Sequence, residues 1–196
     1  MPNKKNNNMN YIIRKATSND SEEIAKLLIT AMEDIASYLF NTNNINDSIE
    51  ILKQFISEDN NQYSWQNCWL VENDHKNIVA ASNIYDGKNL IQLRRKILEY
   101  NLKNFNRELI IEDETQAGEM YIDCIGVSKD HQGKGIGTLL LKHLIETYAI
   151  NNNTPLGLLV DFENPKAKEL YISLGFKKTG EKSLAGKKLD HLQYYK

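Results

Sequence analysis

The sequence predicts a single domain of the α/β (α+β) class, in which strands and helices alternate along the chain. Its 196 residues suit one domain with a sizeable core. Hydrophobic residues make up 41% of the chain and charged residues 26%, which is ordinary for a globular protein. The third observation is local: a strand-like run at 121–127, a glycine-rich turn at 132–137 and a periodic helix follow one another directly.

The first half of the chain carries two helices, a hairpin and a long third helix. A first strand is expected at 11–15, before a helix capped by Asn19 or Asp20. The apolar face of that helix runs through Ile24, Leu27, Leu28, Ala31 and Ile35, and an asparagine-rich turn follows it. The next helix presents Ile51, Leu52, Phe55 and Ile56 on one face. Strands at 68–72 and 78–85 form a hairpin through the turn 73–77, and a helix is expected at 90–105.

The second half alternates more regularly. A strand at 119–127 leads through the glycine turn into a helix that carries Ile136, Leu139, Leu140, Leu144 and Tyr148. A strand at 156–160 and a helix at 164–174 follow, and strands at 176–180 and 191–195 close the sheet. Residues 1–10 are polar and lack the apolar stretch of a signal peptide. We therefore expect a disordered polar leader at 1–10 and one domain at 11–196.

The turn Gln132-Gly133-Lys134-Gly135-Ile136-Gly137 is the most informative segment for function. Its three glycines let a backbone approach a ligand closely, and the helix that follows points free N–H groups and its positive dipole end at the turn. This arrangement predicts binding of a phosphate or pyrophosphate. Lys134 is followed by Gly135, so the P-loop pattern is absent, and the alternating glycines do not fit the dinucleotide fingerprint. The alternative is that the glycines serve turn geometry alone.

A second motif lies at 160–176, which indicates a strand end, a helix and a turn into another strand. Asn164 suits the N-cap, Pro165 the first helical position and Gly175 the C-terminal stop. The chain resembles the GNAT superfamily of acyl-CoA N-acyltransferases through Gln132-x-x-Gly135-x-Gly137 followed by Asn164-x-x-Ala167-x-x-x-Tyr171-x-x-x-Gly175-Phe176. The resemblance spans about residues 119–177, and the pair of motifs is far more specific than either motif alone.

This resemblance implies a GNAT-like mixed, mostly antiparallel central sheet flanked by helices, whose central strands at 119–127 and 156–161 splay apart. Splayed strands leave backbone groups unpaired, and the pantetheine arm of the cosubstrate acetyl-CoA can pair with them like a short strand. The pyrophosphate would lie on the N–H groups of the glycine turn. The residues that the resemblance implies in acetyl-CoA binding are Ile125, Gly126, Val127, Gln132, Gly133, Lys134, Gly135, Ile136, Gly137, Thr138 and Asn164.

Acetyl transfer to an amine needs one group that takes a proton from the ammonium and another that returns a proton to the leaving thiolate. Glu119 and Asp123 are four apart on the predicted strand, so we expect both on one face, at the mouth of the cleft. That face would also carry Tyr121, Ile125 and Val127. Either carboxylate is a candidate base, and the alternative is that each one solvates a strand end or pairs with a lysine.

Tyr171 is the candidate general acid. It lies two helical turns after Asn164, so both residues are expected near one helix face. The family usually places its acid at this motif position, and a phenol can donate a proton to sulfur. A core tyrosine is the alternative. The backbone N–H of Val127 is the candidate oxyanion donor, and direct attack in a ternary complex requires no covalent enzyme intermediate.

The acceptor is predicted from charge. Between 108 and 123 the chain has six acidic residues and no basic one, including Glu112, Asp113 and Glu114. Such a rim would attract a small cationic amine, or the lysine or free N-terminus of a peptide. An acidic surface loop with no partner is an equal alternative. The helix at 90–105 is expected to be a lid or wall of the acceptor site.

The composition of the chain argues against several other classes of function. A net charge of −2 argues against a nucleic-acid or membrane-surface binder, and no apolar run is long enough to span a bilayer. We expect a cytoplasmic protein. Cys68 and Cys124 lack neighbours at ligand spacing, so no metal site is predicted. A homodimer through the C-terminal segment is possible if that segment is an edge strand, and an ordinary final strand is the alternative. The second functional hypothesis is a non-catalytic acyl-CoA-binding sensor or interaction module.

Overall fold

The computed structural model describes residues 10–196, so the predicted leader lies almost entirely outside the described residues. One seven-stranded sheet has the order β1-β2-β3-β4-β5-β7-β6. Its strands are β1 (Ile12–Lys15), β2 (Cys68–Glu72), β3 (Ile78–Asp86), β4 (Met120–Val127), β5 (Leu156–Asp161), β6 (Lys177–Leu184) and β7 (Lys187–Tyr194). The β4–β5 pair is parallel and the other neighbouring pairs are antiparallel, which confirms the predicted mixed, mostly antiparallel sheet.

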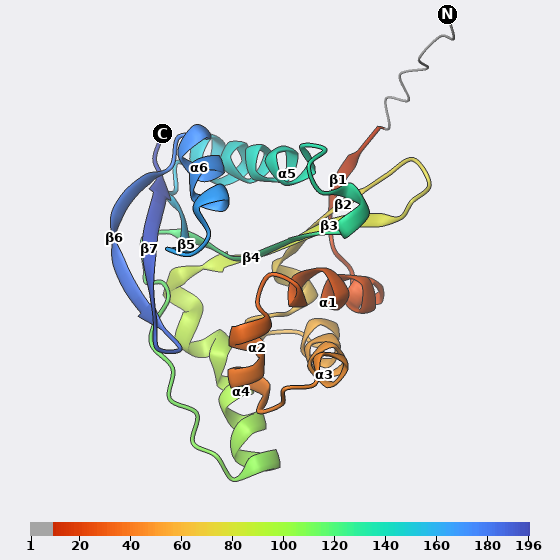
Figure 1. Cartoon of the computed structure of the whole chain (residues 1–196), viewed down its shortest axis with the longest axis vertical. Helices are drawn as coiled ribbons and strands as arrows, with labels where there is room; N and C mark the ends of the chain where they lie inside the picture. Colours follow the sequence, from red (N-terminus) through yellow and green to blue (C-terminus); the bar gives the residue numbers. More distant parts are fainter. Residues whose placement is uncertain (1–9) are drawn as a thin grey trace, which may run out of the picture.

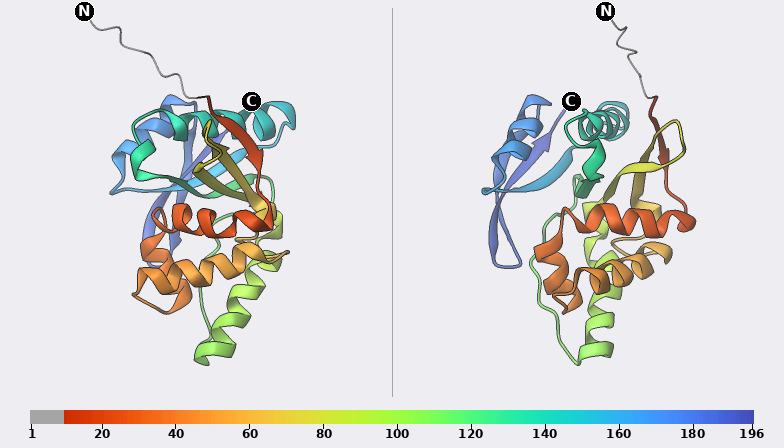
Figure 2. Two further views of the ribbon diagram at one scale, coloured as in Figure 1. Left: turned by 90° about the vertical axis from the view of Figure 1, so that its right-hand side faces the viewer. Right: turned by 45° about the vertical axis from the view of Figure 1, so that its right-hand side comes forward.

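Helices cover both faces of the sheet (Figures 1 and 2). The α-helices are α1 (Ser21–Ile29), α2 (Glu33–Phe40), α3 (Ile45–Ser57), α4 (Leu90–Phe105), α5 (Ile136–Leu144) and α6 (Pro165–Ser173). A π-helical segment, Ile145–Asn151, continues α5. Helices α5 and α6 lie on one face of the sheet, and α1 to α4 lie on the other. No helix within residues 10–196 combines the length and the apolar character that crossing a membrane requires.

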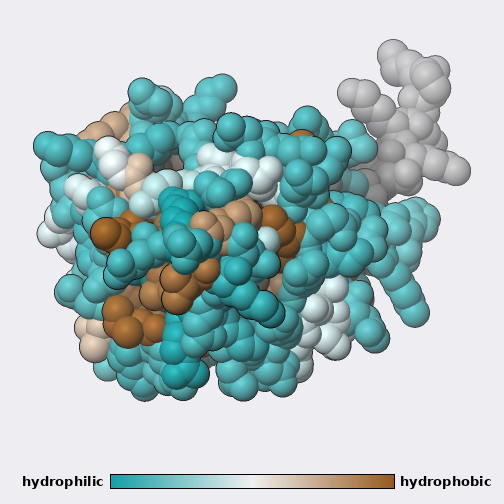
Figure 3. Space-filling model, turned by 90° about the horizontal axis from the view of Figure 1, so that it is seen from below, coloured by the Kyte–Doolittle hydropathy of each residue, from teal (hydrophilic) through white to brown (hydrophobic). Residues whose placement is uncertain are grey.

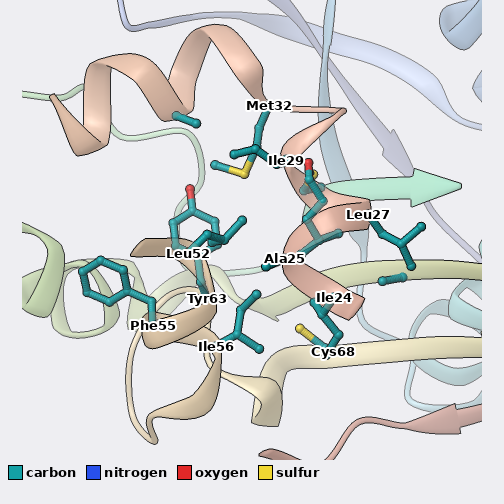
Figure 4. Close-up of a cluster of buried hydrophobic side chains, with 14 of the residues drawn as sticks. Ile24, Ala25, Leu27, Ile29, Met32, Leu52, Phe55, Ile56, Tyr63 and Cys68 are labelled. Atoms are coloured by element: carbon teal, nitrogen blue, oxygen red, sulfur yellow. The ribbon is translucent and has the colours of Figure 1, made fainter. Parts of the chain in front are cut away.

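The larger part of the core lies between α1, α3 and the sheet (Figure 4). Ile24 of α1 and Leu52 and Ile56 of α3 are 0% exposed, and Cys68 at the start of β2 closes this cluster. Complete burial of side chains of this size stabilises the fold by about 1.5–3 kcal/mol each. The predicted apolar face of the second helix is therefore confirmed in α3. This helical layer packs against one face of the central strands and supports them.

The splay of the central strands is confirmed. Strands β4 and β5 pair only at Met120↔Leu156, Tyr121↔Gly157 and Ile122↔Leu158, and they separate beyond these residues. The cause lies on the other side of β4, where Asn83 pairs with Cys124 and Ile84 with Ile122. Asp123 is thus the extra residue of a β-bulge, and a bulge bends its strand and increases the local twist. The bulge starts directly after the last paired residue of β4.

This bulge corrects one sequence prediction. Tyr121 packs with Tyr85 on the α4 side of the sheet, whereas Ile125 packs toward the cluster that contains α5. Strict alternation would have put Tyr121 and Ile125 on the same face. The prediction that Glu119, Tyr121, Asp123, Ile125 and Val127 share a face is therefore wrong, because one inserted residue changes which side chains face each way.

The first helix is also shorter than predicted. Helix α1 ends at Ile29, and the N–H groups of Ala31 and Met32 bond three residues back, to Leu28 and Ile29, in a tight final turn. The predicted apolar stripe through Ala31 and Ile35 is wrong, because Ile35 belongs to a separate helix, α2. The asparagine-rich turn then occupies only 41–44.

The C-terminal hairpin is longer than predicted. Strands β6 and β7 meet at a turn in which Ala185 and Gly186 both have positive φ, 49° and 78°. Exposed lysines along β6 hide the strand from a hydrophobicity pattern. Strand β7 lies between β5 and β6, so the chain ends on an ordinary internal strand. The edge strands of the sheet are β1 and β6, which removes the C-terminal strand as a dimer edge.

The loop after α4 is fixed to α2. The Tyr38 hydroxyl donates to the backbone oxygen of Ile110 at 2.5 Å, and the guanidinium of Arg107 lies 4.6 Å from the centre of the Tyr38 ring.

Apolar side chains gather in a patch on the underside of this helical layer (Figure 3). Exposed apolar residues of α4 and the loop include Leu102, Phe105 and Ile110. The contacts of Tyr38 with Ile110 and Arg107 place the acidic stretch beside the central strands.

Candidate active site

A cleft of about 590 Å³ opens where β4 and β5 separate. Its walls come from β4 and β5, from α2, from the start and middle of α6, and from the β6–β7 hairpin. Asp123 of β4 and Tyr171 of α6 both line it. The structure therefore brings two of the three predicted catalytic residues into one cavity, although 48 positions separate them in the sequence.

Asp123 lies at the bulge with its carboxylate inside a polar cluster. Burial and the nearby negative charge of Glu114 raise its pKa to about 7, while the charge of Arg94 and hydrogen bonds from Gln62 and Tyr85 oppose the rise. A carboxylate with a pKa near neutrality accepts a proton readily while remaining partly ionised. Its place in the cleft wall and its raised pKa keep Asp123 a candidate for the general base.

Tyr171 lies on α6 with its ring packed edge-on against Phe176, at a centroid distance of 5.9 Å. Burial raises the pKa of its phenol to about 12, so the hydroxyl stays protonated at neutral pH. Within residues 10–196 that hydroxyl makes no hydrogen bond to protein. A protonated hydroxyl without a protein acceptor, on the wall of a cleft, is available to a ligand.

Glu119 lies elsewhere. Its side chain is buried just before β4 and accepts hydrogen bonds from Thr115 (2.7 Å), His191 (2.9 Å) and Gln193 (2.6 Å). Burial opposes ionisation of Glu119, but these donors outweigh it and lower the pKa of the carboxyl. Glu119 is absent from the cleft wall. Its contacts tie the start of β4 to β7, so the geometry favours Asp123 as the base.

The glycine turn has the predicted form. Gly133 and Gly135 have φ of 72° and 80°, in the left-handed region that glycine adopts without strain, and Gly135 precedes the first residue of α5. Within residues 10–196, the backbone N–H groups from Gly133 to Thr138 make no backbone hydrogen bond of good geometry. These N–H groups, the dipole of α5 and the exposed side chain of Lys134 suit a pyrophosphate. Gln132 donates to the backbone oxygen of Val127 at 3.0 Å.

The other predicted acetyl-CoA contacts surround the splay. Ile125 and Asn164 line the cleft. The Asn164 side chain caps α6 by accepting a hydrogen bond from the N–H of Ala167 at 3.2 Å, as its motif position predicts. Gly126 has a packing role, because a Cβ there would lie 2.1 Å from the backbone oxygen of Leu27. Helix α1 therefore lies directly against β4 where the splay opens.

Acidic residues dominate the charged part of the cleft wall: Glu33, Asp34, Glu114, Asp123 and Asp161, against the single cation Lys187. Glu33 and Asp34 come from the unpredicted helix α2. Of the three consecutive acids Glu112, Asp113 and Glu114, only Glu114 lines the cleft. Glu112 accepts a hydrogen bond from the N–H of Ala185, and Asp113 accepts one from Arg94. No residue of α4 lines this cleft, so the helix predicted as a lid or wall does not form part of its wall. Helix α2 does form part of that wall.

The comparisons with known proteins identify the family of the chain. Residues 31–176 match the model of the acetyltransferase (GNAT) family, and the chain therefore belongs to that family. No curated protein matches it. An N-acetyltransferase from Staphylococcus aureus has a TM-score of 0.81 and 23% identity, with 93% of this chain and 99% of that chain covered.

Two further solved structures share the fold of the chain. A crystallised acetyltransferase is 30% identical with a TM-score of 0.76, and the match covers 94% of this chain and 98% of that chain. A spermidine N-acetyltransferase chimera from Vibrio cholerae and hSSAT shares the fold at a TM-score of 0.54 and 17% identity, over 94% of this chain and 95% of that chain. The GNAT-like fold predicted from the two motifs is thus confirmed.

Proposed function

We propose that this protein is an N-acetyltransferase that moves an acetyl group from acetyl-CoA to a primary amine by direct attack in a ternary complex. The observation that carries the proposal is the presence of Asp123 and Tyr171 in one cleft, beside the unpaired ends of β4 and β5. A base whose pKa is near 7 and a protonated phenol are the two proton-transfer groups that aminolysis of a thioester needs.

Acetyl-CoA would be held by backbone more than by side chains. The free N–H groups from Gly133 to Thr138 bind the pyrophosphate, and the edge of β4 at Ile125 to Val127 pairs with the amides of the pantetheine arm. The bound thioester supplies the activated acetyl group. Gly126 keeps α1 and β4 in contact, so the strand edge stays rigid.

Each residue then has one task. Asp123 takes a proton from the acceptor ammonium, directly or through a water molecule, and frees the lone pair of the nitrogen. The N–H of Val127 is assigned to the developing oxyanion. Tyr171 donates its proton toward the sulfur as the thiolate leaves. Glu119 contributes by holding β4 against β7, through His191 and Gln193.

The acceptor is a cationic amine, either a small molecule or an amine of a peptide. The cleft wall carries five carboxyl groups and one ammonium group. Lys187 pairs with Asp34 at 2.5 Å and with Asp161 at 3.5 Å, and Glu114 pairs with Arg94. Glu33 and Asp123 are therefore the two acids of the wall without an ion-pair partner within residues 10–196. Such a wall favours positively charged ligands. The spermidine N-acetyltransferase chimera that shares this fold makes polyamines the natural start of an acceptor panel.

The test is mass spectrometry of amines incubated with acetyl-CoA and the protein. Polyamines, aminoglycosides, amino acids and short peptides form the panel, and neutral alcohols of matched size control for transfer to oxygen. An enzyme-dependent gain of one acetyl group on an amine supports the proposal. Tight acetyl-CoA binding without any product across the panel supports the alternative of a non-catalytic sensor, and absence of binding contradicts both.

A further inference from the structure

A polar cluster packs against Asp123, and two of its members, Gln62 and Glu114, also line the cleft. The Tyr85 hydroxyl donates to Oε1 of Glu114 at 2.7 Å and lies 3.4 Å from Oδ1 of Asp123. The amide of Gln62 donates to the same Glu114 oxygen at 2.9 Å and to the Tyr85 hydroxyl at 3.2 Å. Glu114 is 1% exposed. One phenol therefore connects the buried carboxyl group of Glu114 with the carboxyl group of Asp123 on the cleft wall.

Arg94 holds Glu114 in this position. It is 4% exposed on α4, forms an ion pair with Glu114, and donates to the backbone oxygens of Ile111 (3.2 Å) and Glu112 (3.1 Å). The segment between α4 and β4 has no regular secondary structure, so these bonds fix its course. A buried ion pair is weak support for stability, because desolvation of both ions opposes their attraction. That balance points to another role for the pair.

Glu114 and Arg94 are the charged groups that act on Asp123 from the elements packed around it within residues 10–196. The remaining titratable neighbours are phenols and thiols: Tyr63, Tyr85, Tyr121, Cys68 and Cys124. Burial raises the pKa of each of these five groups, so all of them are neutral in the range where Asp123 titrates. Burial makes the largest contribution to the raised pKa of Asp123, and Glu114 and Arg94 are the two charges that modify it.

We propose that Glu114 is a positioning residue for Asp123: it anchors the Tyr85 hydroxyl and sets a second negative charge behind the Asp123 carboxylate, which makes that carboxylate a better proton acceptor. The inference rests on the proposed function, since it takes Asp123 as the base. In the step concerned, an N–H bond of the acceptor ammonium breaks and an O–H bond forms on Asp123. The lone pair stays on the nitrogen, and the proton leaves later to water.

Two substitutions are expected to move the titration of Asp123 in opposite directions. Glu114→Gln removes the negative charge and leaves Arg94 without its buried partner, so the pKa of Asp123 falls by about one unit or more. Tyr85→Phe removes a hydrogen bond that favours the ionised carboxylate, so the pKa of Asp123 rises. Glu114→Asp keeps the charge and is expected to stay close to wild type.

The control is Asp113→Asn. Asp113 accepts from the same Arg94 at 3.0 Å, but its side chain is 57% exposed and faces away from the cleft. Carboxyl resonances followed by ¹³C NMR, assigned through Asp123→Asn, report the pKa without substrate. The acid limb of kcat/KM against pH reports it during turnover, and Glu114→Gln is expected to lower the plateau about tenfold, because a weaker base takes the proton less readily.

The proposal is supported if the pKa of Asp123 falls in Glu114→Gln and rises in Tyr85→Phe. That pKa should change little in Glu114→Asp and Asp113→Asn. An unmoved Asp123 resonance in Glu114→Gln contradicts the proposal. If Glu114→Gln does not fold, the pKa of Asp123 in Tyr85→Phe is the deciding measurement. A raised pKa supports the connection from Glu114 through Tyr85 to Asp123, and an unchanged pKa contradicts it. The failure of the proposed function looks different, because wild type then transfers no acetyl group at any pH while the NMR titration still reports on the cluster.

Discussion

Gly157 and Glu119 face each other across the short paired part of β4 and β5, where a Cβ on Gly157 would lie 1.8 Å from Oε2 of Glu119. The carboxylate cannot withdraw, because Thr115, His191 and Gln193 all donate to it. The last paired residues before the splay thus depend on a glycine and a buried carboxylate. This contact holds together the closed end of the cleft.

Gly157→Ala is therefore expected to destabilise the protein by about 2–3 kcal/mol, which lowers the melting temperature by several degrees for a chain of this size. Thermal unfolding measures it. Gly180→Ala is the matched control, because Gly180 also lies in a strand and a Cβ there meets nothing within 4 Å. Equal melting temperatures for the two variants would contradict the close contact.

Glu119→Gln separates structure from catalysis. The amide cannot accept from all three donors as the carboxylate does, so we expect a lower free energy of unfolding, by about 1–3 kcal/mol, and little change in kcat. Urea unfolding and steady-state kinetics check both quantities. A large fall in kcat at unchanged stability would make Glu119 a catalytic residue.

Asp123→Asn is expected to stabilise the protein in a pH-dependent way. The folded-state pKa of Asp123, about 7, is above its ordinary value of 3.8, so ionisation of this carboxyl opposes folding. Wild type loses stability relative to the variant as the pH rises from about 4 to about 7, and the difference then stays constant. We expect the variant to gain about 2 kcal/mol above neutrality, less than the full shift because water reaches the cleft. Melting temperatures at acid and alkaline pH measure this, and a constant difference would contradict the raised pKa.

The glycine turn is tested by Gly135→Ala. Both backbone strain and a shifted N–H group are expected to weaken acetyl-CoA binding about tenfold, as measured by isothermal titration calorimetry. Gly186→Ala is the control, because Gly186 has nearly the same φ, 78° against 80°, in the β6–β7 turn far from the start of α5. The two variants should lose similar stability, and only Gly135→Ala should change the dissociation constant. A tenfold weakening in both variants would point to a global effect.

The acidic wall is tested by Glu33→Gln. This carboxylate lines the cleft, and its removal should raise the KM of a cationic acceptor about threefold while the KM of acetyl-CoA stays constant. Asp47→Asn is the control, because Asp47 lies in the first turn of α3 as Glu33 does in α2, but outside the cleft. An unchanged acceptor KM in Glu33→Gln would remove α2 from the acceptor site.

Local patterns predicted the conformation of the two motifs well. The glycine turn and the motif from Asn164 to Phe176 combine cap, turn and helix signals that act over a few residues, so short-range chemistry was enough. The α2 wall of the cleft cannot be predicted in this way. Residues of α1 and α2 both show apolar positions at helical spacing, so the pattern predicts one helix, and the break between them depends on i→i−3 bonds at Ala31 and Met32.

The bulge at Asp123 likewise cannot be predicted from the sequence, because a β-bulge depends on the partner strand and produces no repeating pattern of residues. Glu114 looked like one of three equivalent surface acids. Its burial depends on Arg94, which lies 20 positions earlier on α4. Predicting the ion pair between Arg94 and Glu114 would require knowledge of the path of the whole loop from 106 to 119.

The most direct test of the account measures thiol release from acetyl-CoA by wild type, Tyr171→Phe and Asp123→Asn, side by side with one accepted amine. We predict amine-dependent release by wild type and a fall of about 10²–10⁴ in kcat for each variant, with acetyl-CoA affinity retained. Release at the wild-type rate by both variants would show that the chemistry does not use the two groups that the cleft brings together.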